Sequence, residues 1–351
     1  MIKKTASFAK LINNTLSKAM LSNKKVICFG LGATDPKGIF GTTTGLKKKF
    51  GDSRVFDIPA SENAITGFAI GASMNGFIPV LTHQRLDFAL LSLDQIINGA
   101  AKYHYMFGGK INIPICIRLI IGRGWGQGPT HSQNLNSLFA QIPGLKVVIP
   151  STPNDGKNLL YSSIFDPDPV IFLEHRWLHF AEGKYDNNYK KNQLGKSKVI
   201  KKGKDITVCT MSYMTLEAIK AGIFLKKLGI EIEIVDLRTI RPIDFNTINK
   251  SVNKTGSILC VDTGTELFSV SSAIITHSSL NTFKLKNKPE IIGMPNIPEP
   301  TSYYMTKEYY NDYKVIVKKV LQMLKFKGSY SFINNKDEKH DIPNKTFKGP
   351  F

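Results

Sequence analysis

A glycine-rich segment carries a candidate functional histidine. In RGWGQGPTHSQ, residues 123–133, His131 follows three closely spaced glycines, Gly124, Gly126 and Gly128. The simplest interpretation of His131 is a loop histidine at the surface. Glycines permit unusual backbone angles and the close approach of another molecule, which favours a binding loop over an idle surface loop.

A second candidate is Glu62, which opens the helix expected over residues 61–76, SENAITGFAIGASMNG. Its place in the first turn has two interpretations. The carboxylate could simply interact favourably with the helix dipole. Alternatively, the apolar helix behind it would hold the carboxylate at the edge of a core, a setting typical of functional carboxylates.

Further along, RLDFALLSLDQ contains Asp87 and Phe88. By default these residues are a helix cap and a core aromatic. The sequence has no GxxxxGK[ST] phosphate loop, no HExxH pair, and no GxGxxG pattern in its glycine-rich segment. The absence of these motifs argues against the nucleotide-binding and zinc sites that they form.

The elements that must position these residues alternate between short apolar strands and longer helices. This succession is typical of an α/β protein with a largely parallel sheet. Strands are expected at 26–32, 77–82, 113–119, 145–150, 169–174, 206–212, 230–237 and 257–263, and helices at 5–21, 61–76, 90–107, 213–229, 243–255 and 311–324.

A composition shift divides the chain. The strands and helices up to residue 185 form a first α/β domain, and residues 205–327 form a second. Between them, residues 186–204 are polar and basic, as expected of a linker. Residues 328–351 are expected to be a polar, extended tail.

Composition sets broad limits on function. The chain has 351 residues, 42% of them hydrophobic, and a formal net charge of +20. Basic surfaces attract nucleic acid, but the lysines are scattered without a recognition motif, which favours a solvated surface instead. No apolar stretch reaches the ~20 residues that span a bilayer. The acid-free first 34 residues resemble a transit peptide, but their helical spacing favours a first domain helix and a cytoplasmic protein.

Four cysteines, Cys28, Cys116, Cys209 and Cys260, each lie within a short apolar run. No CxxC spacing suggests metal binding, and no loop placement suggests disulfides. We expect reduced cysteines in buried strands.

Several long motifs in the right order resemble a known family. They are RVFDIPASENAITGFAIGASMNGFIPV, DFALLSLDQIINGAAKYHYMFGG, THSQNLNSLFAQIPGLKVVIPSTPNDGKNLL, FDPDPVIFLEHRWL, VDLRTIRPIDFNTINKSVNKT and PNIPEPTSYYM. Together they cover about residues 5 to 325 and resemble the beta subunit of thiamine diphosphate-dependent 2-oxoacid dehydrogenases of the pyruvate and branched-chain type. The resemblance implies a pyrimidine-binding domain followed by a transketolase C-terminal-like domain.

The resemblance also implies roles for the candidate residues. Glu62 matches the glutamate that bonds a ring nitrogen of the cofactor's aminopyrimidine, and Phe88 matches the aromatic residue that stacks on it. His131 matches the histidine that handles protons as the acyl group passes to a lipoyl arm. Ile115, Ser163, Ile164, Asp166 and Asp168 match positions that hold a structural potassium ion in some members.

The family divides its cofactor site between subunits. An alpha subunit with a GDG motif followed by an asparagine holds the diphosphate and its magnesium, whereas the only GD here lies in GDSR, at the wrong place. The resemblance therefore implies an α2β2 assembly, a small 2-oxoacid substrate and docking to a lipoyl acyltransferase.

This chain departs from the family at several positions. Leu31 replaces a glutamate near the cofactor, and THQRLDF introduces Thr82, His83 and Arg85 on the expected substrate side. Arg85 could pair with an anionic group of a substrate other than pyruvate, or lie at the surface or a subunit interface. VDTGTELFSVSS, residues 261–272, replaces the turn linked to acyltransferase docking.

Two other functions stay open at this point. One is a transketolase-like or acyloin-type transfer that uses the same cofactor without lipoyl chemistry, which the altered segments would permit. The other is a non-catalytic scaffold of the same fold. The joint presence of Glu62, Phe88 and His131 argues against the scaffold.

Overall fold

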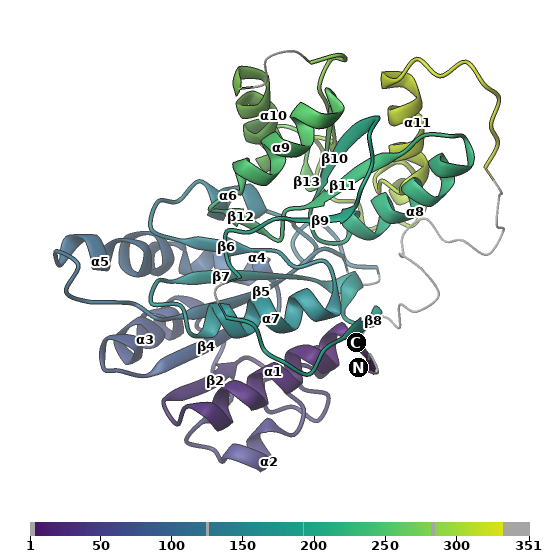
Figure 1. Cartoon of the computed structure of the whole chain (residues 1–351). Coiled ribbons are helices and arrows are strands. Elements are labelled where there is room, and N and C mark those ends of the chain that lie inside the picture. Colours follow the sequence, from purple (N-terminus) through teal and green to yellow (C-terminus); the bar gives the residue numbers. More distant parts are fainter. Residues whose placement is uncertain (1–3, 124–125, 192, 282–284, 333–351) are drawn as a thin grey trace.

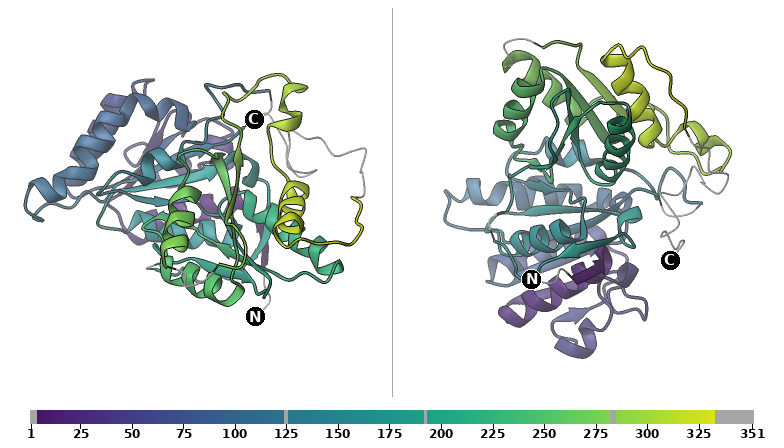
Figure 2. Two further views of the ribbon diagram at one scale, coloured as in Figure 1. Left: turned by 90° about the horizontal axis from the view of Figure 1, so that it is seen from above. Right: turned by 45° about the vertical axis from the view of Figure 1, so that its right-hand side comes forward.

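A computed structural model describes residues 4–123, 126–191, 193–281 and 285–332, which form two α/β domains (Figure 1). Each domain has its own main sheet, but one edge strand of the first sheet, at residues 239–241, comes from the segment predicted as the second domain. The candidate residue Gly124 lies outside these ranges. In the views of Figure 2 the second domain stacks on the first, and helices flank both sheets.

The first domain has a seven-stranded sheet in the order β12-β6-β7-β5-β4-β2-β3. All neighbouring strands are parallel except β12, which pairs antiparallel with β6. The strands are β2 (Val26–Gly30), β3 (Val55–Phe56), β4 (Ile78–His83), β5 (Cys116–Ile121), β6 (Lys146–Val148), β7 (Val170–His175) and β12 (Thr239–Arg241).

Helices cover both faces of this sheet because its strands are apolar on both sides. In β2, Val26 and Cys28 pack toward α1 (Phe8–Ser22) and α7 (Pro153–Ile164), whereas Ile27 and Phe29 pack toward α3 (Glu62–Met74). The alternation follows from the period of two in a strand. Two apolar layers thus hold the sheet that positions the candidate site.

The second domain has a five-stranded sheet in the order β14-β13-β10-β11-β9, parallel except for β9. Its strands are β9 (Lys198–Lys201), β10 (Ile206–Thr210), β11 (Ile232–Asp236), β13 (Ile258–Thr265) and β14 (Glu290–Met294). Its helices are α8 (Met214–Lys227), α9 (Phe245–Thr255), α10 (Val270–Asn281) and α11 (Tyr313–Met323).

The predicted strands and most predicted helices are present, with some differences. The helix expected over 90–107 is a 3₁₀ turn, η2 (Leu90–Ser92), then a π-helical turn, η3 (Gln95–Ala100), then α5 (Ala101–Met106). The first helix starts later than expected because β1 (Lys4–Ser7) pairs with β8 (Glu182–Tyr185). The shorter elements are η1 (Ile39–Gly41), α2 (Leu46–Phe50), α4 (Leu86–Ala89), α6 (Asn136–Ala140), η4 (Arg176–Leu178) and η5 (Met305–Glu308).

The segment predicted as a linker, 186–204, contains regular structure. Its residues 198–201 form the edge strand β9, paired with β11. Upstream, the Lys157 ammonium of α7 donates to the Asp186 carbonyl at 2.8 Å, which ties this segment to the first domain. The start of the predicted tail is also packed, since the Phe332 and Phe224 rings lie 5.1 Å apart. Residues 333–351 lie outside the described ranges.

All four cysteines are buried and free, as predicted. They lie in β2, β5, β10 and β13. Within the described ranges, no helix combines the length and the apolar character needed to cross a membrane.

A buried ion network crosses the middle of the first sheet. The Arg118 guanidinium of β5 bonds both oxygens of Glu174 on β7, at 2.5 and 3.0 Å, and donates to the Thr82 hydroxyl at 3.1 Å. Burial alone would raise the pKa of Glu174, but Arg118 and His179 lower it to about 2. The carboxylate is therefore charged at neutral pH and neutralises a fully buried arginine.

We predict that Glu174→Gln destabilises the fold by about 3 kcal/mol or more, because it leaves the buried Arg118 charge without its partner. The matched control is Glu231→Gln, which breaks an exposed 3.9 Å ion pair with Lys204 and should cost less than about 1 kcal/mol. Urea unfolding of both variants measures the difference. Equal losses would contradict this role of the network.

Candidate active site at the carboxyl edge of the first sheet

The predicted site residues meet where parallel strands of the first sheet end. Leu31 follows β2, Arg85 follows β4, and the glycine-rich loop with His131 follows β5. β4 lies between β2 and β5 and pairs parallel with both, so the carboxyl ends of the three strands lie along one edge. Ligands of open α/β sheets bind outside this edge.

The structure brings Phe88 and His131 into direct contact. Their ring centroids are 5.4 Å apart and the rings are nearly perpendicular, at 88°, an edge-to-face arrangement that aromatic rings favour. The His131 side chain is exposed, and its Nδ1 lies 3.1 Å from the Thr130 hydroxyl. Phe88 is half-buried. An accessible imidazole therefore stands beside an aromatic surface that is partly open.

Asp87 fixes this contact. Its Oδ1 accepts hydrogen bonds from the Gln133 side-chain amide at 2.8 Å and from the Gln133 backbone N–H at 3.4 Å. The bonds join α4, which carries Phe88, to the loop that carries His131. The default interpretation of Asp87 as a helix cap is wrong, because Arg85 occupies the cap position and the carboxylate binds the loop. The only sequence feature that could have pointed to this role is that Asp87 directly precedes Phe88.

Arg85 also holds the loop. Its guanidinium donates to the Gly122 carbonyl at 3.1 Å and to the Gln127 side-chain carbonyl, and it lies over the Phe40 ring. The side chain is 4% exposed within this chain, which does not fit a surface arginine. Burial lowers its pKa to about 10, so it keeps its charge at neutral pH. As placed here, Arg85 is engaged with the loop and not open to a substrate.

Glycine is required where this loop leaves β5. Gly122 has a φ of +75°, and a Cβ built there would lie 2.4 Å from His175 Nε2. A larger residue would push the loop off the sheet edge. Gly126, with a φ of +67°, makes a second left-handed turn in the described part of the loop.

His83 supports the helix that begins with Glu62. The Thr66 hydroxyl donates to the Glu62 carbonyl at 2.8 Å and lies 3.4 Å from His83 Nε2. Burial lowers the pKa of His83 to about 4, so the ring is neutral at pH 7. His83 is thus packed beneath the site, whereas the Glu62 side chain is half-buried at the rim.

Leu31 lies at the same edge and is 37% exposed. Its carbonyl accepts a 2.6 Å hydrogen bond from Gln84, and the next residue, Gly32, donates its N–H to Asp57 at 2.9 Å. The loop after β2 is therefore held in place, with the apolar side chain of Leu31 partly exposed.

The residues that match potassium ligands lie at the amino edge of the first sheet, where its strands begin. Ile115 precedes β5, Asp168 precedes β7, and Ser163 and Ile164 end α7. The Ile115 carbonyl accepts from Val170 N–H at 2.9 Å. The Lys146 ammonium forms ion pairs with both nearby carboxylates, at 2.6 Å from Asp166 and 3.0 Å from Asp168. The residues do come together, but far from the Phe88 and His131 pair, and a lysine ammonium neutralises the carboxylates.

The chain matches two family models in sequence. Residues 4–179 match the transketolase pyrimidine-binding domain, and residues 195–316 match the transketolase C-terminal domain.

Curated relatives match most of the chain. The beta subunit of an acetoin:2,6-dichlorophenolindophenol oxidoreductase from Cupriavidus necator is 40% identical over 302 residues, which cover 83% of this chain and 89% of the relative. The pyruvate dehydrogenase E1 component subunit beta of Staphylococcus aureus is 39% identical over 275 residues, 78% of this chain and 84% of the relative. The mitochondrial subunit beta-1 from Arabidopsis thaliana is 36% identical, covering 82% and 81%.

A solved structure has the same fold. A split-gene transketolase, described as an inactive beta4 tetramer, superimposes with a TM-score of 0.74 over 92% of this chain and 99% of that chain. At 19% sequence identity this likeness concerns the fold alone.

We predict that Asp87→Ala loosens the loop that carries His131. Hydrogen-deuterium exchange of the peptide containing Gln133 should become at least several-fold faster, because a hydrogen bond worth about 1 kcal/mol is lost at its amide. Asp87→Asn keeps an acceptor oxygen and serves as the matched control, with exchange near that of the native chain. Unchanged exchange in Asp87→Ala would show that the loop is fixed by other contacts.

Proposed function

Because the chain belongs to the transketolase family, together with the beta subunits of pyruvate and acetoin dehydrogenases, we propose that it is the beta subunit of a thiamine diphosphate-dependent 2-oxoacid dehydrogenase. It would oxidatively decarboxylate a 2-oxoacid together with an alpha subunit. The observation that supports the proposal is the contact between Phe88 and His131, together with the position of Glu62 at the start of α3, which follows β3, the strand that pairs with β2 in the same sheet.

These residues fit one half of a thiamine site. Glu62 offers a half-buried carboxylate at the start of α3, suited to a ring nitrogen, and Phe88 offers a ring face for the aminopyrimidine. Thiamine diphosphate supplies an electron sink for carbon-carbon bond cleavage. The protein's part is to orient the aminopyrimidine through Glu62 and Phe88.

His131 would hold and move a proton in the same reaction. Its imidazole is exposed, so substrate can reach it, and its Nδ1 contacts the Thr130 hydroxyl. Asp87 and Arg85 position the imidazole through the loop. We place its role at the transfer of the acyl group to a lipoyl arm, as the family resemblance implies.

The other half of the site would come from an alpha subunit that binds the diphosphate and magnesium, in an α2β2 assembly. In support, large apolar side chains are exposed on the helices flanking the first sheet. They are Phe68, Met74, Leu91, Tyr105 and Met106. Docking of a lipoyl acyltransferase is part of the same proposal.

A structural potassium ion remains a proposal for the amino edge of the sheet. Ile115, Ser163 and Ile164 supply backbone carbonyls there, the hard oxygen donors that such a cation takes. With Lys146 bound to Asp166 and Asp168, carbonyl oxygens would carry most of the coordination.

One finding favours a second candidate, an acyloin-type reaction without lipoyl chemistry. The relative that is 40% identical is named an acetoin oxidoreductase. Exposed Leu31 at the cofactor edge makes the rim more apolar than the family glutamate would. Substrate tests separate the two candidates.

We predict that Glu62→Gln, purified with its partner subunit, loses activity by about two to three orders of magnitude, the range of acid-base contributions. Assembly should be normal, because Glu62 lies at the rim and its backbone carbonyl, not its carboxylate, takes the hydrogen bond from Thr66. Asp52→Asn, an exposed carboxylate paired with Lys47, is the control and should retain full turnover. Near-native turnover by Glu62→Gln would rule out the proposed site.

Affinity purification of this chain from its native cell should recover a roughly equimolar partner with a GDG motif and a following asparagine. The purified pair, supplied with thiamine diphosphate and magnesium, should decarboxylate a 2-oxoacid. Oxidation of acetoin with dichlorophenolindophenol, without 2-oxoacid turnover, would favour the second candidate. Recovery of the chain alone or with nucleic acid would favour a non-catalytic scaffold.

A further inference from the structure

Phe40 has a backbone conformation that large side chains rarely adopt. It lies within η1, in the loop between β2 and α2, with a φ of +52° and a ψ of +34°, in the left-handed region. A glycine takes this region without strain, as Gly41 does next to it at a φ of +82°. Such outliers persist where surrounding contacts enforce them, and they cluster at functional sites. A ring kept at such a position is therefore expected to have a role.

Hydrogen bonds that follow Phe40 in the chain hold this conformation. The Thr42 hydroxyl donates to the Ile39 carbonyl at 2.7 Å and accepts from the buried Arg118 guanidinium at 3.0 Å. The Asn13 side-chain amide of α1 donates to the Thr42 carbonyl at 3.1 Å. The loop is thus bonded to the ion network of the first sheet, and this fixes the place of the Phe40 ring.

Two buried guanidinium groups lie over the Phe40 ring. The central carbon of Arg176 is 4.3 Å from the ring centroid and that of Arg85 is 5.4 Å from it, both within the range of a cation–π interaction. Burial and, to a smaller extent, the charge of Arg85 lower the pKa of Arg176 to about 10, so both groups are charged at neutral pH. Their repulsion is poorly screened because both are buried. The negative face of an aromatic ring offsets it.

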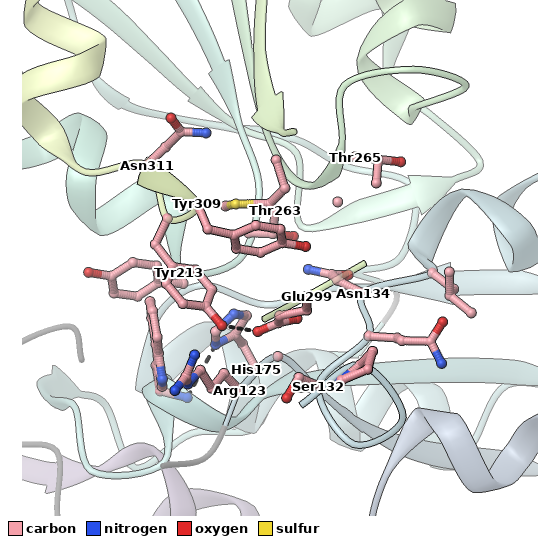
Figure 3. Close-up of a pocket in the computed structure, with 18 of the residues that line it drawn as sticks. Arg123, Ser132, Asn134, His175, Tyr213, Thr263, Thr265, Glu299, Tyr309 and Asn311 are labelled. Carbon is pink, nitrogen blue, oxygen red and sulfur yellow. Dashed lines mark hydrogen bonds between the residues drawn. The ribbon is translucent and has the colours of Figure 1, made fainter. Parts of the chain in front are cut away.

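The glycine-rich loop depends on Arg85 because the second domain supports that loop only in part. A cavity of about 240 Å³ lies between the loop and the second domain, and Figure 3 shows Ser132 of the loop below this space and Thr263 of β13 above it. From the first domain, the Arg85 guanidinium donates to the Gly122 carbonyl at 3.1 Å and to the Gln127 side chain. A displacement of Arg85 would therefore loosen the loop.

We propose that Phe40 is a positioning residue for this loop. Its ring fixes the guanidinium of Arg85, and Arg85 in turn fixes the backbone and side chains that lead to His131. The Phe40 ring also stacks on His179, with centroids 5.4 Å apart and 27° between the rings, and His179 Nε2 lies 3.2 Å from Glu174. One side chain thus joins the buried ion network of the sheet to the rim of the candidate active site.

Phe40→Leu tests the proposal because it removes the ring face and keeps a similar apolar volume. Hydrogen-deuterium exchange of the peptide spanning residues 126–133 in the full chain should become about fivefold faster, since a buried cation–π contact is lost. Phe40→Tyr keeps the ring and should retain native exchange. Phe40→Gly suits the left-handed backbone, so a similar acceleration in that variant would assign the effect to the missing ring and not to backbone strain.

Phe50→Leu is the matched control. Its ring lies 5.3 Å from the central carbon of Arg54, a cation–π contact like that of Phe40, but the Arg54 guanidinium donates to the Val26 carbonyl at 2.8 Å and so serves another part of the sheet. Exchange of the peptide spanning residues 126–133 should be unchanged in this variant.

A double-mutant cycle tests whether Phe40 acts through Arg85. In an Arg85→Met background, Phe40→Leu should accelerate exchange by less than about twofold, because the two residues act in series. Native exchange in Phe40→Leu, acceleration by Phe40→Tyr as large as that by Phe40→Leu, or an equal Phe40→Leu effect with and without Arg85 would overturn the proposal.

The consequence for turnover rests on the proposed function. In the assembly with the partner subunit, Phe40→Leu should lower kcat several-fold and leave KM near the native value, because a loosened loop misplaces the His131 imidazole. The exchange experiments contain no cofactor or substrate. The expected exchange pattern without any 2-oxoacid turnover by the native pair would therefore refute the proposed function and leave the positioning role standing.

Discussion

The carboxylate of Asp87 links the two segments on which the candidate active site depends. It accepts two hydrogen bonds from Gln133, and by doing so it sets the aromatic ring of Phe88 against the imidazole of His131. Arg85 makes a parallel link from the same turn to Gly122 and Gln127. A loop rich in glycine would otherwise sample many conformations at considerable entropic cost. The position of His131 is therefore fixed by the side chains of Asp87 and Arg85, and not by the loop's own backbone.

Beneath this rim, the first sheet is held together by charges as well as apolar layers. Arg118 and Glu174 join β5 to β7, and Arg118 reaches Thr82 at the end of β4. Of these strands, β4 leads into α4 and β5 leads into the glycine-rich loop. Thr82, which the sequence comparison placed among the substrate-side changes, serves this internal network. The departure at that position is thus explained by packing of the sheet.

Much of the fold could be predicted from sequence because its strands are continuous apolar runs between helices with clear periodicity. Four strands that were not predicted, β3, β9, β12 and β14, lie at sheet edges, where distant segments decide the pairing and local pattern gives little signal. The helices α7 and α10 were also not predicted from the sequence. Glu62, Phe88 and His131 were predicted as site residues from the family resemblance that their motifs carry. The roles of Asp87, Arg85 and His83 could not, because their hydrogen bonds join residues remote in sequence, and burial is what separates a packed residue from a substrate contact.

The central claim is that this chain supplies the aminopyrimidine half of a shared thiamine site. The most direct test is a crystal structure of the chain with its partner subunit, thiamine diphosphate and magnesium. The account predicts the Glu62 carboxylate within hydrogen-bonding distance of an aminopyrimidine nitrogen, the ring stacked on Phe88, and His131 on the substrate side, with the diphosphate held by the partner. A cofactor bound away from Glu62 and Phe88, or held entirely by the partner, would contradict it.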